Sequence, residues 1–371
     1  MSSWVECHQA SEAAAIEAEK RLREGNLSQA ALLYAQAAEY EQKALAAIDP
    51  AKVRTKSITA VSAVALWYKA SNYERAEQLA YAMLADASIP QFARKELRDL
   101  VQAIWTESSK MAAGVGFLPG QVLVSVKGGE VITGGAPLDL IVEKVQTIQA
   151  MFYRTVEFIN DMPLRARGAP PRDIQESCRP WLFQAAPGSY QFSVAIQEPK
   201  QLDFFKEHIG PELVAQQFLQ IVQATTSSDP KELEAVVPKL EYRKAFLKLS
   251  RNLAPTGKKF DSIEFRAPAG GPPVSLTSEA RTVINQSIKG EQRRAPEDAQ
   301  DIMEEHMGIL RAVDLDNDFL DVAVEGQTLH IVGLEDAMDD VIGPMVNKKI
   351  KLTVVRGVKG APRFRDIELD E

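Results

Sequence analysis

Apolar residues recur at the spacing of an α-helix through about the first hundred residues of the chain. The first run lies in residues 11–25, ends at the break Gly25-Asn26, and contains Ala14, Ile16, Ala18 and Leu22. Further helices are predicted, between polar or proline-containing breaks, over residues 28–47, 52–70, 73–85 and 90–105. The pattern predicts stacked antiparallel helices, with residues 11–105 almost entirely helical.

Residues 24–37, EGNLSQAALLYAQA, resemble the tetratricopeptide repeat around its helix-helix turn. Gly25 corresponds to the turn glycine, Ala30 to the small residue where two helices cross, and Tyr34 to the large packing residue. The same offsets recur 46 residues later, at Ser71, Ala76, Ala80 and Met83. That spacing departs from the roughly 34 residues of the family, and Ser71 replaces the glycine. The resemblance covers about residues 10–107 and implies a helical repeat that binds a partner.

The period changes after a glycine-rich break at residues 114–120. A hairpin of β-branched residues is predicted first, from the runs 121–126 and 130–133. Residues 138–159 predict a long helix with one apolar stripe, and a proline-rich loop then leads to a short helix ending near Phe183. Strict alternation over residues 189–197 predicts a strand with one buried face.

The remaining central patterns predict helices over residues 211–224, 230–237, 241–253 and 278–289, and strands over residues 260–266 and 274–277. Strands separated by helices favour an α+β domain. The polar, charged stretch that follows is the predicted linker.

The last seventy or so residues alternate like strands. Three strands, a helix and two strands are predicted, over residues 308–314, 319–324, 327–332, 334–346, 349–356 and 364–369. This element order resembles the oligonucleotide/oligosaccharide-binding barrel, and an SH3-like barrel stays open as an alternative.

The sequence therefore predicts a multidomain α+β protein. Its parts are a helical-repeat domain (1–112), a central α+β domain (113–290), a linker (291–302) and a small five-stranded β-barrel that folds independently (303–371).

Composition indicates an ordinary globular protein, with 45% hydrophobic and 25% charged residues. There is no run of about 18 apolar residues and no basic, signal-like start, so we expect neither a membrane span nor secretion. The two cysteines, Cys7 and Cys178, fit a reducing compartment, and we expect a cytoplasmic protein.

Charge is unevenly distributed. Residues 301–371 hold 16 acidic and 8 basic residues, which equals the whole formal charge of −8. Lys244, Lys248 and Arg251 share one helical face, and we expect them to form a patch open to solvent. The candidate nucleic-acid contacts are Arg165, Arg167, Arg172, Lys244, Lys248, Arg251, Lys258 and Lys259. Because the barrel is acidic, we expect it to dock on the cationic part of the central domain or on a basic partner, and not to bind nucleic acid.

Other motifs favour structural roles. The glycine-rich residues 127–135 lack a phosphate-loop pattern and indicate a hairpin turn and helix entry. A calcium-binding loop pattern is matched at its first, third, fifth and twelfth positions by Asp314, Asp316, Asp318 and Glu325. However, Phe319 replaces the glycine of the sixth position, which favours a solvated β-turn. Cys178, with His208 as the alternative catalytic partner, is interpreted as a buried structural thiol. No catalytic, cofactor-binding or metal-binding residue is assigned.

The favoured hypothesis is a non-catalytic adaptor or regulatory protein that binds a protein partner through its helical-repeat segment. A nucleic-acid-binding component that uses the central basic stretches is the second hypothesis. An enzyme whose site assembles from scattered residues is the third. The sequence indicates no oligomeric state.

Overall fold

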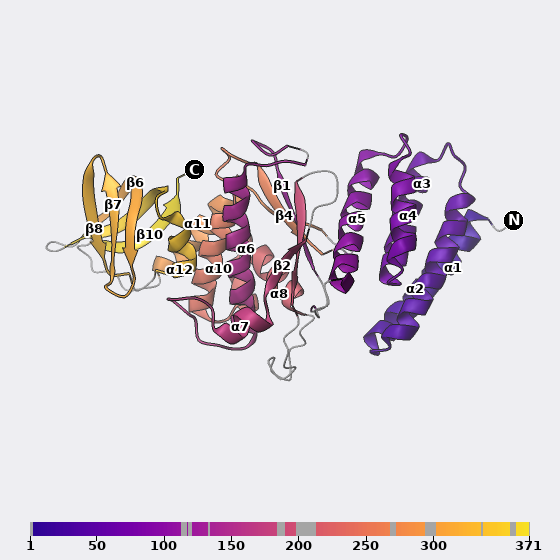
Figure 1. Cartoon of the computed structure of the whole chain (residues 1–371), viewed down its shortest axis with the longest axis horizontal. Helices are drawn as coiled ribbons and strands as arrows, with labels where there is room; N and C mark the ends of the chain where they lie inside the picture. The colour runs from indigo at the N-terminus through magenta and orange to yellow at the C-terminus, as the bar shows by residue number, and fades with distance from the viewer. Residues whose placement is uncertain are drawn as a thin grey trace.

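The computed structural model describes residues 3–112, 117, 121–132, 134–183, 190–197, 213–267, 272–293, 302–334, 337–356 and 361–370. Figure 1 shows a row of three parts: the helical segment at the N-terminal end, a mixed helix-and-sheet layer in the middle, and a ring of strands at the other end. The predicted multidomain α+β architecture is confirmed.

The N-terminal part consists of helical hairpins packed side by side. Its helices are α1 (Trp4–Arg23), α2 (Leu27–Ala46), α3 (Val53–Lys69), α4 (Tyr73–Leu84) and α5 (Gln91–Ala112). Each packs on the next, and α3 also packs on α5. The prediction that residues 11–105 are almost entirely helical is confirmed.

Helix α1 begins earlier than its apolar pattern predicted. The Ser3 hydroxyl accepts a hydrogen bond from the Glu6 backbone N–H, and the Glu6 carboxylate accepts one from the Ser3 backbone N–H. This reciprocal pair is a capping box, which satisfies N–H groups that the first helical turn leaves without partners. The signal was present in the sequence as Ser3 followed three residues later by Glu6.

The two hairpin turns have the same geometry. Gly25 and Ser71 both adopt a positive φ, 76° and 57°. In each turn the next residue donates its backbone N–H five residues back, Asn26 to Arg21 and Asn72 to Trp67. Each asparagine side chain then caps the following helix. These bonds satisfy the last carbonyls of one helix and the first N–H groups of the next.

The central sheet has the order β2-β3-β1-β4-β5, and every pair is antiparallel. Its strands are β1 (Val122–Lys127), β2 (Pro180–Phe183), β3 (Gln191–Ile196), β4 (Ser262–Arg266) and β5 (Val274–Leu276). The helices of this part are α6 (Leu138–Ile159), α7 (Arg172–Ser177), α8 (Leu213–Thr225), α9 (Pro230–Val236), α10 (Leu240–Leu253) and α11 (Ser278–Arg293).

Strand β3 corrects the prediction of a single buried face, because all six of its residues are buried. Its side chains Phe192, Val194 and Ile196 belong to the core that includes α6, α8 and α10. Its polar side chains face α5: Gln191 donates to Asp99 at 2.8 Å, and the Ser193 and Thr106 hydroxyls lie 2.5 Å apart. The last helix of the N-terminal part therefore covers the second face of the sheet.

The predicted short helix and hairpin also need correction. Helix α7 ends at Ser177, and residues 180–183 form the edge strand β2, where a proline at the first position is tolerated. Strand β1 pairs with β3 and β4 rather than with residues 130–133, of which Thr133 lies outside the described residues. Gly129 packs so tightly that an added Cβ would lie 2.3 Å from the Lys259 carbonyl oxygen. The glycine-rich stretch is thus a packed turn.

The C-terminal strands form a closed barrel in the order β10-β8-β7-β6-β9. The strands are β6 (Ile302–Asp314), β7 (Phe319–Val324), β8 (Gln327–Val332), β9 (Lys349–Arg356) and β10 (Arg363–Leu369). The predicted helix over residues 334–346 is reduced to α12 (Asp339–Ile342) and a 3₁₀ turn, Gly343–Met345. Pro344 explains the early end, because proline lacks the N–H that a continuing helix requires.

The central part and the barrel share one continuous hydrophobic core. Buried residues of α10, such as Phe246, belong to the same cluster as Val341 of α12 and Ile367 of β10. Helix α11 extends to Arg293 and β6 begins at Ile302, so the ends of the predicted linker are helix and strand, and residues 294–301 lie outside the description.

Candidate functional site

Helix α6 carries four buried charged residues within its largely apolar sequence: Glu143, Lys144, Arg154 and Glu157. A buried charge is tolerated when it is paired and hydrogen-bonded. Each of these charges has such a partner, and two of the partners, Asp340 and Lys348, belong to the barrel module. Helix α6 therefore links the central part to the barrel.

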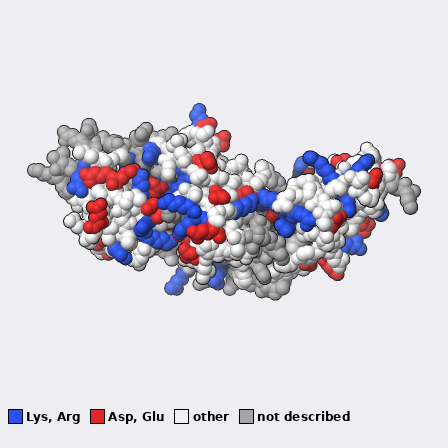
Figure 2. Space-filling model, turned by 90° about the horizontal axis from the view of Figure 1, so that it is seen from above, with Lys and Arg blue, Asp and Glu red and all other residues white. Residues whose placement is uncertain are grey.

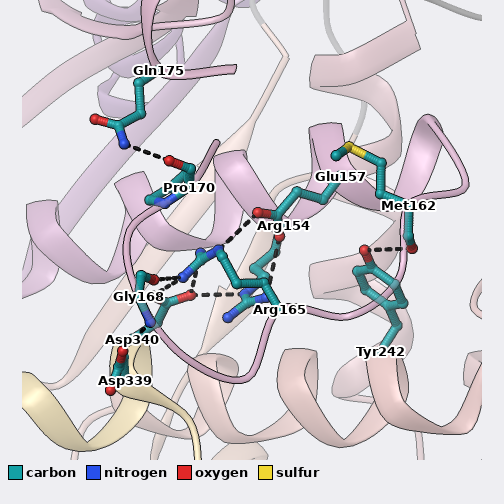
Figure 3. Close-up of polar contacts among 10 residues, drawn as sticks. All are labelled: Arg154, Glu157, Met162, Arg165, Gly168, Pro170, Gln175, Tyr242, Asp339 and Asp340. Atoms are coloured by element: carbon teal, nitrogen blue, oxygen red, sulfur yellow. Dashed lines mark hydrogen bonds and ion pairs between the residues drawn. The ribbon is translucent and has the colours of Figure 1, made fainter. Parts of the chain in front are cut away.

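Figure 3 shows four charged side chains converging between α6, the loop of residues 160–171 and α12. We call this loop the arginine loop. Arg154 Nε donates to Asp340 Oδ2 at 2.7 Å, and Arg165 Nη2 donates to the same oxygen at 3.1 Å. Glu157 accepts from Arg154 at 3.2 Å and from Arg165 at 3.0 Å. Two guanidinium groups and two carboxylates thus compensate one another.

Burial opposes the charge on Arg165, but Asp340 and Glu157 outweigh that effect and raise its pKa above the ordinary value. The arginine loop is held in addition by backbone contacts. The Asp339 N–H donates to the Ala166 carbonyl at 3.2 Å, and the Tyr242 hydroxyl donates to the Met162 carbonyl at 3.1 Å. The loop is therefore a fixed part of the interface with the barrel.

A second clamp joins α10 to β10. Arg251 donates from Nη1 and Nη2 to the two carboxylate oxygens of Asp366, at 2.5 and 2.9 Å, and also to the Ile367 carbonyl at 2.6 Å. Burial alone would raise the pKa of the Asp366 carboxyl, but the Arg251 guanidinium holds it below its ordinary value. Paired, planar geometry of this kind is the strong form of an arginine-carboxylate bond.

The expectation of a solvent-exposed patch on α10 is wrong. Lys248 is 5% exposed and Arg251 is 1% exposed, and only Lys244 of the three is partly open to solvent. The face that the spacing assigned to solvent is covered by the barrel, which supplies the carboxylate of Asp366. Of the two expected docking sites for the acidic barrel, the structure shows the cationic part of the central domain, and a basic partner stays a prediction.

The other candidate basic residues lie apart from this clamp. Arg167 and Lys258 are exposed and lie 3.7 Å from Asp316 and 3.5 Å from Asp370 of the barrel. Arg172 is exposed and Lys259 is partly exposed. On the face seen in Figure 2, basic and acidic side chains alternate over the barrel and the central part. The structure does not gather the predicted residues on one cationic surface.

A cleft of 380 Å³ lies beside the network, between α6, the arginine loop and α12. Its walls include Gln146, Gln149 and Tyr153 of α6, together with Arg165 and Asp340. Burial raises the pKa of Tyr153, so its hydroxyl stays protonated and can donate a hydrogen bond. Because the charged groups are compensated, the cleft supplies hydrogen bonds and little net charge.

The other motifs hold structural positions. The Asp314 carboxylate accepts from the backbone N–H groups of Asp316 and Asn317, which forms the predicted turn. Asp318 accepts from the N–H groups of Gly333 and Leu334. Cys178 is fully buried, as interpreted, while His208 lies outside the described residues. The described part of the chain contains no group of three or more histidine, cysteine and acidic side chains placed to hold a metal.

The outer face of the first hairpin is the other candidate surface. Helix α1 packs chiefly on α2 and is the outermost helix of the row (Figure 1). Val5, Gln9, Glu12 and Ile16 share one stripe of α1, and all are exposed, with Ile16 at 69%. Leu32 of α2 is 72% exposed. These apolar side chains have no place in the described core.

Sequence reasoning missed Arg154, Glu157, Asp340 and Asp366. The first two lie among apolar residues of α6, which was the available signal, since charged side chains are seldom fully buried unless paired. Asp340 lies 186 residues from Arg154, and Asp366 lies 115 residues from Arg251, so only the fold could identify these pairs.

Within the described residues, no helix is long and apolar enough to cross a bilayer. The chain matches no family model, no curated protein and no solved structure.

Proposed function

We propose that this chain is a non-catalytic adaptor that binds a protein partner through its N-terminal helical hairpins, in a cytoplasmic multi-protein system. The observation that carries the proposal is the exposed outer face of α1, where Val5 and Ile16 are 49% and 69% open to solvent. Exposed apolar side chains rimmed by polar ones are typical of surfaces that bind proteins. Here Gln9 and Glu12 lie between them.

The resemblance to the tetratricopeptide repeat supports this function. Equivalent turns at Gly25 and Ser71, with the same hydrogen bonds 46 residues apart, are what a repeated helical hairpin requires. Stacked hairpins of this kind present extended surfaces to partners. The N-terminal segment therefore acts as the binding part, and the central part supports it through α5.

The barrel acts as a structural module in this proposal. Its element order supports the resemblance to the oligonucleotide/oligosaccharide-binding barrel, with a helical turn between the third and fourth strands and a parallel contact between the third and fifth. However, Asp340 and Asp366 are engaged by arginines of the same chain. Fold alone assigns no ligand to it.

The test compares the intact chain with the double variant Val5→Glu, Ile16→Glu and with the control Leu182→Glu, which alters a 51% exposed apolar residue on β2. Partners captured from the native host would be identified, purified and mixed with each chain. We expect a stoichiometric complex with the wild type and the control and none with the double variant, because buried charge in an apolar contact is costly. Equal binding by all three chains would contradict the assignment to α1.

Nucleic-acid binding has less support. Lys248 and Arg251, which would neutralise phosphates, are buried, and Arg165 is engaged by Glu157 and Asp340. A gel shift with single-stranded DNA that weakens steeply with salt would revive this hypothesis.

A further inference from the structure

The first half of β6 has an open edge. Residues 302–309 pair with β9, whereas pairing with β7 begins only at Ile309. Among the residues that the structure describes, nothing pairs with the other edge of residues 302–308. An exposed strand edge presents main-chain groups to which another strand can bind.

The hydrogen bonds of β9 determine which main-chain groups point to this edge. The Asp370 N–H donates to the Lys349 carbonyl at 3.1 Å, so the odd-numbered residues at this end of β9 face β10 and the even-numbered ones face β6. Even-numbered residues of β9 pair with even-numbered residues of β6, as in Glu304 with Val354. The open edge therefore carries the N–H and C=O groups of Met303, Glu305 and Met307.

The side chains at this edge are unusually apolar for a solvent-exposed strand. Ile302, Met303 and Met307 are 65%, 53% and 52% exposed. Charged residues lie between them: Glu304, which lies 3.1 Å from Arg356, and Glu305, which lies 3.0 Å from Lys351.

We infer that a second copy of this chain binds here, with the two β6 strands antiparallel and the two-fold axis at Glu305. In that register Met303 of each copy faces Met307 of the other, and each such pair can exchange two main-chain hydrogen bonds. Glu304 of each copy faces His306 of the other, so a carboxylate meets an imidazole N–H. The edge is thus complementary to itself, which a two-fold interface requires.

The geometry of the barrel fits this register. In a copy centred at Glu305 the outermost main-chain hydrogen bonds join Met303 and Met307, two residues before pairing with β7 starts at Ile309 of β6, and β7 itself packs against Gly308. The two Glu305 side chains meet at the axis, where like charges destabilise a strand pair. Lys351 lies beside each of them and offsets this repulsion.

The barrel that carries this edge lies at the opposite end of the molecule from α1 (Figure 1), and the inference does not rest on the proposed function. The first test measures the mass of the full chain in solution across a concentration series, by light scattering after gel filtration. We expect a dimer for the wild type and a monomer for Met303→Glu, Met307→Glu. The control Met111→Glu, at a 77% exposed methionine of α5, should remain a dimer. A monomeric wild type at every concentration overturns the inference, as does a dimer that survives the double variant.

The second test checks the register by cross-linking. The two native cysteines are buried, so a new cysteine reports on its own position. Glu305→Cys places two thiols across the axis, within the Cα separation that a disulfide accepts. We expect a cross-linked dimer on oxidation of this variant and none for Thr328→Cys, at an exposed position of β8. Cross-linking at Thr328 and not at Glu305 would overturn the proposed pairing. A peptide strand bound by a persistently monomeric chain would identify a different occupant and would also overturn it.

Discussion

Gly25 and Ser71 occupy equivalent turns, but they differ in backbone strain. A positive φ is open to glycine and costs a residue with a Cβ roughly 1 to 2 kcal/mol. The chain accepts this cost at Ser71, where φ is 57°. The hydrogen bonds of the turn therefore compensate for a residue that is not ideal for it.

Replacing Gly25 by alanine should lower the free energy of unfolding by about 1 kcal/mol. No atom lies within 4 Å of the added Cβ, so the loss would report backbone strain alone. Gly290→Ala is the matched control, since that glycine lies within α11 and also faces open space. It should raise the free energy of unfolding by about 0.5 to 1 kcal/mol, because alanine favours a helix. Urea titrations of the three chains measure both changes, and a loss in both variants would contradict the argument.

At the scale of helices and strands, small residues set how closely the first hairpin packs. Ala30 is 2% exposed and lies in a cluster with Ala18 of α1 and Tyr34. Ala76 is fully buried in the cluster that contains Trp67. Both alanines lie at buried helix contacts, as the repeat resemblance predicted.

Ala30→Leu should destabilise the protein by roughly 1 to 3 kcal/mol, because the added atoms overpack a buried contact. Leu32→Ala, two residues away and exposed, should change stability by less than about 0.5 kcal/mol. Thermal unfolding followed by circular dichroism compares the two. An unchanged melting temperature for Ala30→Leu would show that the contact is loose.

Removing one partner of the clamp between α10 and β10 should lower the free energy of unfolding strongly. Arg251→Ala leaves the Asp366 carboxylate largely buried without its guanidinium partner, which typically costs about 3 to 5 kcal/mol. The control Lys258→Ala removes an exposed partner of Asp370 and should cost about 0 to 1 kcal/mol. Limited proteolysis would locate the loss, since we expect cleavage to rise near the barrel in Arg251→Ala alone. Equal resistance of both variants to proteolysis would show that the shared apolar core is sufficient to hold the barrel on the central part.

At the scale of the whole molecule, a shared hydrophobic core and several ion pairs bind the barrel to the central part. In some of these pairs the central part supplies the cation, and in another it supplies the anion. Arginines of α6, the arginine loop and α10 bind carboxylates of the barrel module, and Glu143 of α6 accepts from Lys348. Burial would raise the pKa of the Glu143 carboxyl, but Lys144 and Lys348 hold it below its ordinary value. The independent folding of residues 303–371 stays a prediction, and the fragment would have to expose part of this core.

These carboxyl groups predict how stability changes with pH. The pKa of Asp366 and that of Glu143 are both lower in the folded chain than in the unfolded chain. Their contribution is therefore complete above the ordinary carboxyl values of about 4, and is lost as the pH falls through the lower folded values. Urea unfolding at a series of pH values should show this loss in the wild type and a smaller one in Asp366→Asn. If the free energy of unfolding of the two chains depended on pH in the same way, Asp366 would be excluded as a source of the loss of stability at low pH.

The sequence by itself determined the local order of the protein. Helical spacing located α1 to α5, and alternation located most barrel strands, because these periods follow from backbone geometry alone. Its errors arose where distant segments meet. The buried second face of β3 depends on α5, and the burial of Arg251 depends on Asp366, 115 residues later.

Only the tertiary structure decided which charged residues are buried in ion pairs and which are exposed to solvent. Helical spacing shows that Lys244, Lys248 and Arg251 share a cationic face of the helix. The spacing contains no information about whether another segment of the chain covers that face. The acidic balance of the last module indicated a cationic partner, but the docking required particular carboxylates to lie within hydrogen-bonding distance of particular guanidinium groups. Such contacts depend on distances between residues far apart in the chain, and these distances are set when the shared core forms.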